Sequence, residues 1–199
     1  MKLQHEEYLK NITTITIGAQ VWMQRNLDVA FFRNGDPIPE VRDVDEWKRY
    51  GEQGKPCWCY YYNDPANGKI YGKLYNWYAV NDPRGLAPVG WHVSTDSDWA
   101  IFINYYGGGK NAVAAIQSKT GLDKSKSGNS SNSSGFSGLP GGYRTEIGFF
   151  TIGSWGCWWS STDSDASNAW YCVLNFKRGS VGRHLDKKIN GFSVRCVRD

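Results

Sequence analysis

Residues that could carry catalysis or bind a metal are few and scattered along the 199-residue chain. The three histidines, His5, His92 and His184, lie far apart, and none has a partner at the spacing of a metal site or a catalytic pair. We expect His92 to be a hydrogen-bonded structural residue and His184 to contact a ligand. The histidines therefore predict neither a catalytic site nor a metal site.

The five cysteines do not indicate a zinc site or a complete set of disulfides. Cys57 and Cys59 are closer together than the cysteines of a CxxC motif, and no second motif of that kind follows. An odd number of cysteines leaves at least one thiol free in any disulfide scheme. Cys157, Cys172 and Cys196 lie among aromatic and β-branched residues, where burial raises the pKa of a thiol. We therefore predict buried, unreactive thiols, no catalysis and no cofactor.

Calcium-dependent sugar binding and a membrane span are not predicted either. The segments 63–65 and 81–83 have the sequence Asn-Asp-Pro, which is typical of turns and lacks the clustered carboxylates that calcium requires. No stretch of eighteen apolar residues occurs. The first ten residues lack the apolar core of a secretory signal, so we expect either that the protein is not exported by that route or that the chain is part of a longer one.

The net charge of +4 is concentrated between Lys177 and Asn190. This segment holds five cationic residues and one acidic residue, which accounts for the whole net charge. A phosphate-binding surface usually carries more cations with aromatic residues between them, so we expect no nucleic-acid partner. The segment has neither helical nor strand periodicity, which indicates that packing does not dictate its side chains.

Local patterns predict few helices and many short strands. A hairpin is expected between Ile12 and Trp22, and Thr95 with Asp98 forms a capping box that begins the most secure helix. Further helices are predicted at 44–53, with Asp43 as its cap, at 71–80 and at 111–118. Strands are predicted at 142–145, 148–152, 157–161, 169–176 and 192–198.

The Ser- and Gly-rich stretch at 121–138 is low in complexity, and its composition cannot bury enough surface to offset the entropy of ordering it. We expect a mobile excursion from one domain that spans residues 1–199. Adjacent Trp158 and Trp159 should point to opposite faces of a strand, one into the core and one over a loop.

Four motifs in order resemble a known family: YGKLYNWYAVNDPRGLAPVGWHVSTDSDW, GLPGGYR, GCWWSST and GFSVRCVRD. They are similar to the Fibrobacter succinogenes major paralogous domain, related to the formylglycine-generating-enzyme-like branch of the C-type lectin fold. The resemblance runs from about residue 14 to residue 199. It implies an α+β, C-type-lectin-like fold with two main helices, a small antiparallel sheet and long loops.

A subset of such domains are variable proteins of diversity-generating retroelements, from gut bacteria and their phages. The resemblance implies that a segment like 156–199 is rewritten at template adenines, often in Asn codons, which never yields Lys, Trp, Met, Gln or Glu. Trp170, Lys177, Lys187 and Lys188 would then be fixed or come from other codons, and Asp163, Asp165 and Ser167 are weaker candidates. The predicted ligand contacts are Tyr171, Val173, Arg178, Ser180, Gly182, His184, Leu185, Asp186 and Ile189.

The resemblance and the segment together predict a ligand-binding module, a receptor-binding protein or adhesin, and no enzyme. The expected partner is a protein or glycan on a cell surface, and the expected location is a bacterial surface, the secreted fraction or a phage tail tip. Arg178, His184, Leu185 and Asp186 should then turn outward on a shared face. The alternatives are a non-variable accessory domain and a formylglycine-generating-type enzyme, and the sequence does not predict an oligomeric state.

Overall fold

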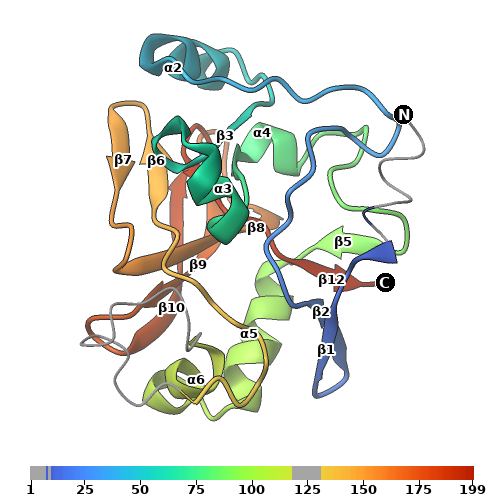
Figure 1. The fold of residues 1–199 in the computed structure, drawn as a ribbon, viewed down its shortest axis with the longest axis vertical. Coiled ribbons are helices and arrows are strands. Elements are labelled where there is room, and N and C mark those ends of the chain that lie inside the picture. The colour runs from blue at the N-terminus through green and yellow to red at the C-terminus, as the bar shows by residue number, and fades with distance from the viewer. Residues whose placement is uncertain (1–7, 9, 118–130) are drawn as a thin grey trace.

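Figure 1 shows a computed structural model in which residues 8, 10–117 and 131–199 are described. Short helices lie around antiparallel sheets, so the fold is α+β. The helices are α2 (Val44–Glu52), η1 (Tyr61–Asn63), α3 (Pro65–Tyr71), α4 (Trp77–Val80), α5 (Asp96–Tyr105) and α6 (Gly109–Ile116). The strands are β1 (Thr14–Ile17), β2 (Gln20–Met23), β3 (Trp58–Cys59), β4 (Leu74–Asn76), β5 (Trp91–Val93), β6 (Tyr143–Thr145), β7 (Gly148–Phe150), β8 (Trp155–Asp163), β9 (Asn168–Asn175), β10 (Ser180–Lys187), β11 (Gly191–Phe192) and β12 (Cys196–Arg198).

The strands form three sheets where the sequence predicted one. Their orders are β1-β2-β12-β5, β10-β9-β8 and β3-β4-β11-β6-β7. The last two strands of the chain are interior strands, because β11 pairs with β4 and β6, and β12 pairs with β2 and β5. The carboxy-terminal residues therefore join the front half of the chain to the back half.

Several local predictions are confirmed. The hairpin β1–β2 turns at Gly18, and α2 begins after Asp43, whose side chain accepts a hydrogen bond from the Glu46 amide. The capping box of Thr95 and Asp98 begins α5. In each case the residue types satisfy amides of the first helical turn, so the signal is local and readable in sequence.

The predicted helix at 71–80 is confirmed only at 77–80. The structure has α3 before this segment, then β4 and the short α4. Asp64 accepts from the Ala66 amide and Pro65 occupies the first turn, so the Asn-Asp-Pro sequence begins a helix rather than a simple turn. Gly72, with φ +74°, ends that helix in a conformation that L side chains rarely adopt.

The Ser- and Gly-rich stretch is only partly described, and residues 121–130 of the predicted excursion lie outside the described residues. Its remainder is packed, contrary to the prediction, because Phe136 is a buried core residue. The amides of Ser131 and Ser134 donate to carbonyls of α6. One aromatic side chain with several local hydrogen bonds is thus enough to hold these residues against the domain.

Two apolar clusters lie on opposite faces of β8. Trp159 belongs to the cluster around Phe192 and Val194, while Trp158 belongs to the cluster around Trp99. Both tryptophans are buried, at 0% and 1% exposure, so the expectation that one of them covers a loop is wrong. The strand is enclosed on both faces at this point, which makes it a rigid support for its neighbour β9.

Arg195 is fully buried at the junction of distant segments. Its Nη1 donates to the carbonyl oxygens of Met23 and Phe136, each at 2.9 Å. Its Nε and Nη2 donate to Oδ1 of Asn26 at 3.1 and 2.9 Å. The segment 193–195 therefore faces the interior on both sides, and Arg195 joins β2, the loop after it and the segment before β6.

Replacement of Arg195 by Met should destabilise the fold strongly. The carbonyls of Met23 and Phe136 would remain buried without a donor, and each such group costs about 1–3 kcal/mol. We expect R195M to lower the free energy of unfolding by about 3 kcal/mol, measured by urea denaturation. The control is R198M, at an exposed position, with a change below about 1 kcal/mol. Equal effects of the two substitutions would contradict this role.

Candidate functional site

The segment that the sequence singled out is the second half of a β-hairpin. Residues 180–187 form β10, which pairs with β9 in continuous antiparallel register and lies at the edge of its sheet. The prediction that this segment lacks strand structure is wrong. Main-chain bonds to β9 define the strand, whereas its side chains are mostly exposed and so show no alternation of burial.

A four-residue turn, 176–179, connects the two strands of this hairpin. Oδ1 of Asn175 accepts from the amides of Lys177 and Arg178, at 3.1 and 3.0 Å. Gly179 has φ +61°, and a Cβ atom there would meet nothing within 4 Å. Backbone conformation, rather than space, thus favours glycine at this position.

The predicted contact residues divide between the two faces of the hairpin. Tyr171 pairs with His184, and Val173 pairs with Gly182, so these four share one face. Leu185 pairs with Trp170 on the opposite face. The expectation that Leu185 shares a face with His184 and Asp186 is therefore wrong.

Exposure separates the candidates further. Arg178, Ser180, His184 and Leu185 are exposed, and Tyr171, Gly182 and Asp186 are partly buried. Val173 is only 8% exposed and belongs to the core cluster. Ile189 packs so closely on α2 that a Cβ atom at Gly51 would lie 2.0 Å from it. Val173 and Ile189 thus support the hairpin from within.

Aromatic residues that the sequence analysis did not select continue the face of Tyr171 and His184. Phe192 lies between Tyr171 and Tyr143, with ring centroids 4.7 and 5.6 Å away. Tyr143 in turn packs on Phe150 and Trp155, at 5.7 and 6.4 Å. The alternation of aromatic and small residues at 142–150 was the available signal for a second hairpin, but nothing in it predicts which sheet that hairpin borders.

Asp186 is the acidic residue of this face. Its Oδ1 accepts from the Lys187 amide and from Nδ2 of Asn190, at 2.8 and 2.9 Å. Burial raises the pKa of Asp186, and the nearby charge of Glu146 adds to the effect. Burial also raises the pKa of Tyr171 and of Tyr143, to which the charge of Asp186 contributes. The face therefore combines neutral phenols with one partly desolvated carboxylate.

Ion pairs hold the base of the hairpin to the rest of the domain. Arg183 donates to Asp96 at the start of α5, and Lys187 Nζ lies 2.8 Å from Glu146. Lys188 is buried, with its Nζ 2.7 Å from Oδ1 of Asp163 and 4.4 Å from the Trp77 ring centroid. Lys188 is thus a structural residue rather than a contact residue.

The weaker candidates lie at the end of β8, which is Asp163, and in the turn between β8 and β9. Asp163, Asp165 and Ser167 are all exposed. The carboxylate of Asp165 accepts hydrogen bonds from the Asn168 side chain and from the amides of Ser167 and Asn168. These bonds lower the pKa of Asp165, and the bond from the Asn168 side chain has the largest effect. Asp165 therefore shapes this turn.

The cysteines and His92 lie in buried or hydrogen-bonded positions. All five cysteines are buried and free. Burial raises the pKa of Cys59 to about 11 and that of Cys196 to about 12. His92 is hydrogen-bonded through both ring nitrogens, to Asp199 at 2.9 Å and to Asp98 at 3.1 Å. Across residues 10–117 and 131–199, no group of three His, Cys, Asp or Glu side chains is placed to hold a metal.

The fold and this surface define an α+β domain that presents a β-hairpin on an aromatic-rich frame. The family model of the Fibrobacter succinogenes major domain matches residues 15–198, and the chain belongs to that family. Comparison with the curated proteins and with the solved structures gives no match. In the part of the chain that the structure describes, no helix has the length and apolar character that crossing a membrane requires.

The buried thiols generate a direct test of the enzymatic alternative. In the native protein all five cysteines should react slowly with a thiol reagent, because burial keeps them protonated and out of reach. In urea all five should react rapidly, which serves as the internal control, and mass mapping assigns each site. Rapid labelling of two cysteines in the native protein would contradict this expectation and favour a formylglycine-generating-type enzyme.

Proposed function

We propose that the chain is a ligand-binding module whose contact surface is the β9–β10 hairpin and the aromatic face beside it. The observation that carries the proposal is the contrast across this hairpin. Cys172 and Leu174 are core residues, whereas His184 and Leu185 are exposed on a backbone that β9 holds in register, and Arg178 is exposed in the turn. Exposed side chains on a fixed backbone can bind a partner without ordering themselves at the moment of binding.

We further propose that the fold is C-type-lectin-like and that the chain is a variable protein of a diversity-generating retroelement. The exposed residues Arg178, Ser180, His184 and Leu185 are all accessible from an Asn codon by changes at its first two bases. Lys188, which is not accessible in this way, is buried and ion-paired. The match between codon accessibility and exposure at these five positions supports the proposal, although Lys177 and Lys187 are exposed and would have to be fixed or come from other codons.

The ligand of this proposal is a protein or a glycan on a cell surface, which suits a phage tail tip or a bacterial adhesin. Aromatic and cationic side chains next to each other are typical of the residues that dominate protein interfaces. The Tyr171 face offers phenols and the Asp186 carboxylate, and the tip of the hairpin offers Arg178 and Lys177.

One observation favours the second candidate, a non-variable accessory domain of the same family. Val173 and Ile189 belong to the predicted contact set and yet pack within the domain. If the whole hairpin is conserved for its packing, the surface serves one fixed partner. The two candidates differ in how much substitution the exposed positions tolerate.

Two displayed libraries would test the proposal. The first randomises Arg178, His184 and Leu185, and the matched control randomises Val173 and Ile189. We expect most members of the first library to resist protease like the parent, because exposed substitutions change stability by about 0.5 kcal/mol or less. Most members of the control library should be cleaved, because truncated core side chains cost about 1–5 kcal/mol.

Equal losses in the two libraries would contradict the display of exchangeable residues. Sequencing of the coding region in a natural population separates the two candidates. Excess change at the codons of the exposed residues, beside a reverse transcriptase and a near-copy of the segment, supports the retroelement. Invariance at those codons supports the accessory domain.

A further inference from the structure

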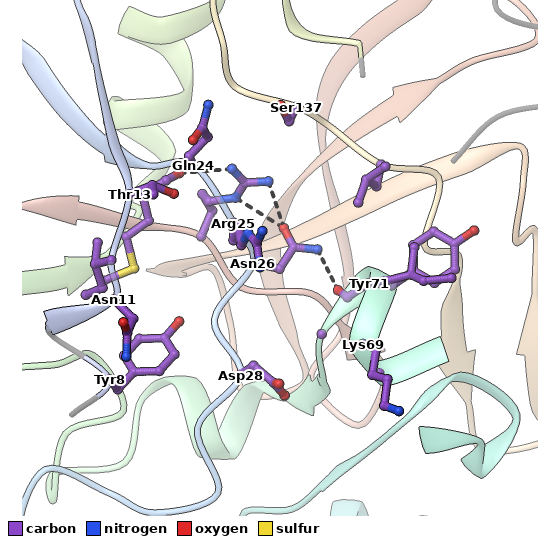
Figure 2. A pocket seen from close by; sticks show the side chains of 17 residues that line it. Tyr8, Asn11, Thr13, Gln24, Arg25, Asn26, Asp28, Lys69, Tyr71 and Ser137 are labelled. Atoms are coloured by element: carbon purple, nitrogen blue, oxygen red, sulfur yellow. Dashed lines mark hydrogen bonds between the residues drawn. The ribbon is translucent and has the colours of Figure 1, made fainter. Parts of the chain in front are cut away.

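A cavity of about 720 Å³ lies apart from the hairpin, and none of the predicted contact residues lines it. Its walls come from the segment around Asn26, from the end of α3 and from Ser137, as Figure 2 shows, and Leu139 also lines it. Arg195 forms part of the same lining. The volume is within the range that accommodates a small organic ligand.

The positive charge of Arg195 has no carboxylate partner within the described residues. Every acceptor around it is neutral: two main-chain carbonyls, Oδ1 of Asn26 and the ring of Phe136, whose centroid lies 4.0 Å away. Burial lowers the pKa of Arg195 to about 9, which reflects this uncompensated charge. Its four hydrogen bonds use four of five N–H groups, so one Nη2 donor has no described partner.

Two further cations line the cavity. Arg25 and Lys69 are exposed, and neither is in an ion pair with any described residue. The acid in the lining, Asp28, is already paired with Lys73, at 2.5 Å between Oδ1 and Nζ. The lining therefore carries an excess of positive charge around a desolvated guanidinium, and an anion that enters would supply the missing counter-charge.

The rest of the lining suits hydroxyl groups. The side-chain hydroxyl of Thr13 and Oε1 of Gln24 have no hydrogen-bond partner among the described residues, although Nε2 of Gln24 donates to the Gly135 carbonyl. Tyr71 contributes a partly buried ring on the opposite side of the cavity. Amide and hydroxyl groups on one side and an aromatic ring on the other match the polar edge and the apolar face of a sugar ring.

We propose that this cavity binds a small hydroxylated carboxylate of the sugar-acid class. The carboxylate is directed to the cationic lining of Arg25, Lys69 and Arg195, and the hydroxyl groups meet Thr13 and Gln24. The site is independent of the hairpin, so the chain has two binding surfaces with different chemistry.

Calorimetry with glucuronate, glucose and acetate tests this site. We expect glucuronate to bind at least about tenfold more tightly than either of the other probes, because only glucuronate offers both the carboxylate and the hydroxyl groups. Added salt should weaken glucuronate binding, since Arg25 and Lys69 are exposed to screening. R25A and K69A should each weaken it by about tenfold. Matched controls on α2, R49A and K48A, are exposed, do not line the cavity and should leave it unchanged.

The proposal is overturned if glucuronate shows no saturable binding up to about 10 mM. If glucose bound as tightly as glucuronate, the cations would not contribute to binding. If acetate bound as tightly as glucuronate, the hydroxyl groups would not contribute. Unchanged binding in both R25A and K69A would place the ligand elsewhere. None of these results depends on substitutions in the hairpin, so failure here leaves the proposed function of β10 untouched.

Discussion

Buried cations that are held by neutral groups tie this domain together. Arg195 and Arg144 are each 1% exposed, and each donates to main-chain carbonyls of segments far away in the sequence. Arg144 binds the carbonyls of Val41, Arg42 and Asp43 just before α2, and its guanidinium lies 4.3 Å from the Trp47 ring centroid. Because a buried cation is strongly disfavoured without acceptors, these loops are held where their carbonyls are needed.

This arrangement explains why a chain with short helices and strands contains so many aromatic rings. Main-chain carbonyls in loops lack the hydrogen-bond donors that a helix or a sheet would provide. One guanidinium group can donate hydrogen bonds to several of these carbonyls at once. An aromatic face then covers the guanidinium or ammonium group, as Phe136 does for Arg195 and Trp58 does for Lys73. The two buried lysines, Lys73 and Lys188, also pair with the carboxylates of Asp28 and Asp163, whereas the described hydrogen bonds of Arg144 and Arg195 go to neutral acceptors.

Local signals in the sequence were sufficient for the parts of the fold whose stabilising contacts are close in sequence. The capping box at Thr95, the Asp43 cap and the first hairpin belong to this group. The three-sheet arrangement was not predictable, because β11 and β12 join strands more than a hundred residues away. The lack of periodicity that singled out residues 177–190 also concealed β10, because main-chain pairing alone defines this strand.

The contrast between the buried body of the domain and the exposed side chains of the β9–β10 hairpin originates in β8. Trp158 extends from β8 to the opposite side of the domain, where its Nε1 donates to Oδ1 of Asn26 at 2.8 Å, the same atom that accepts from Arg195. Trp159 fills the other face and donates to the Tyr75 carbonyl. With β8 fixed on both faces, β9 inherits its register from a strand that cannot shift, and β10 inherits its register from β9. The side chains of His184 and Leu185 are exposed on β10 and take no part in these contacts of β8.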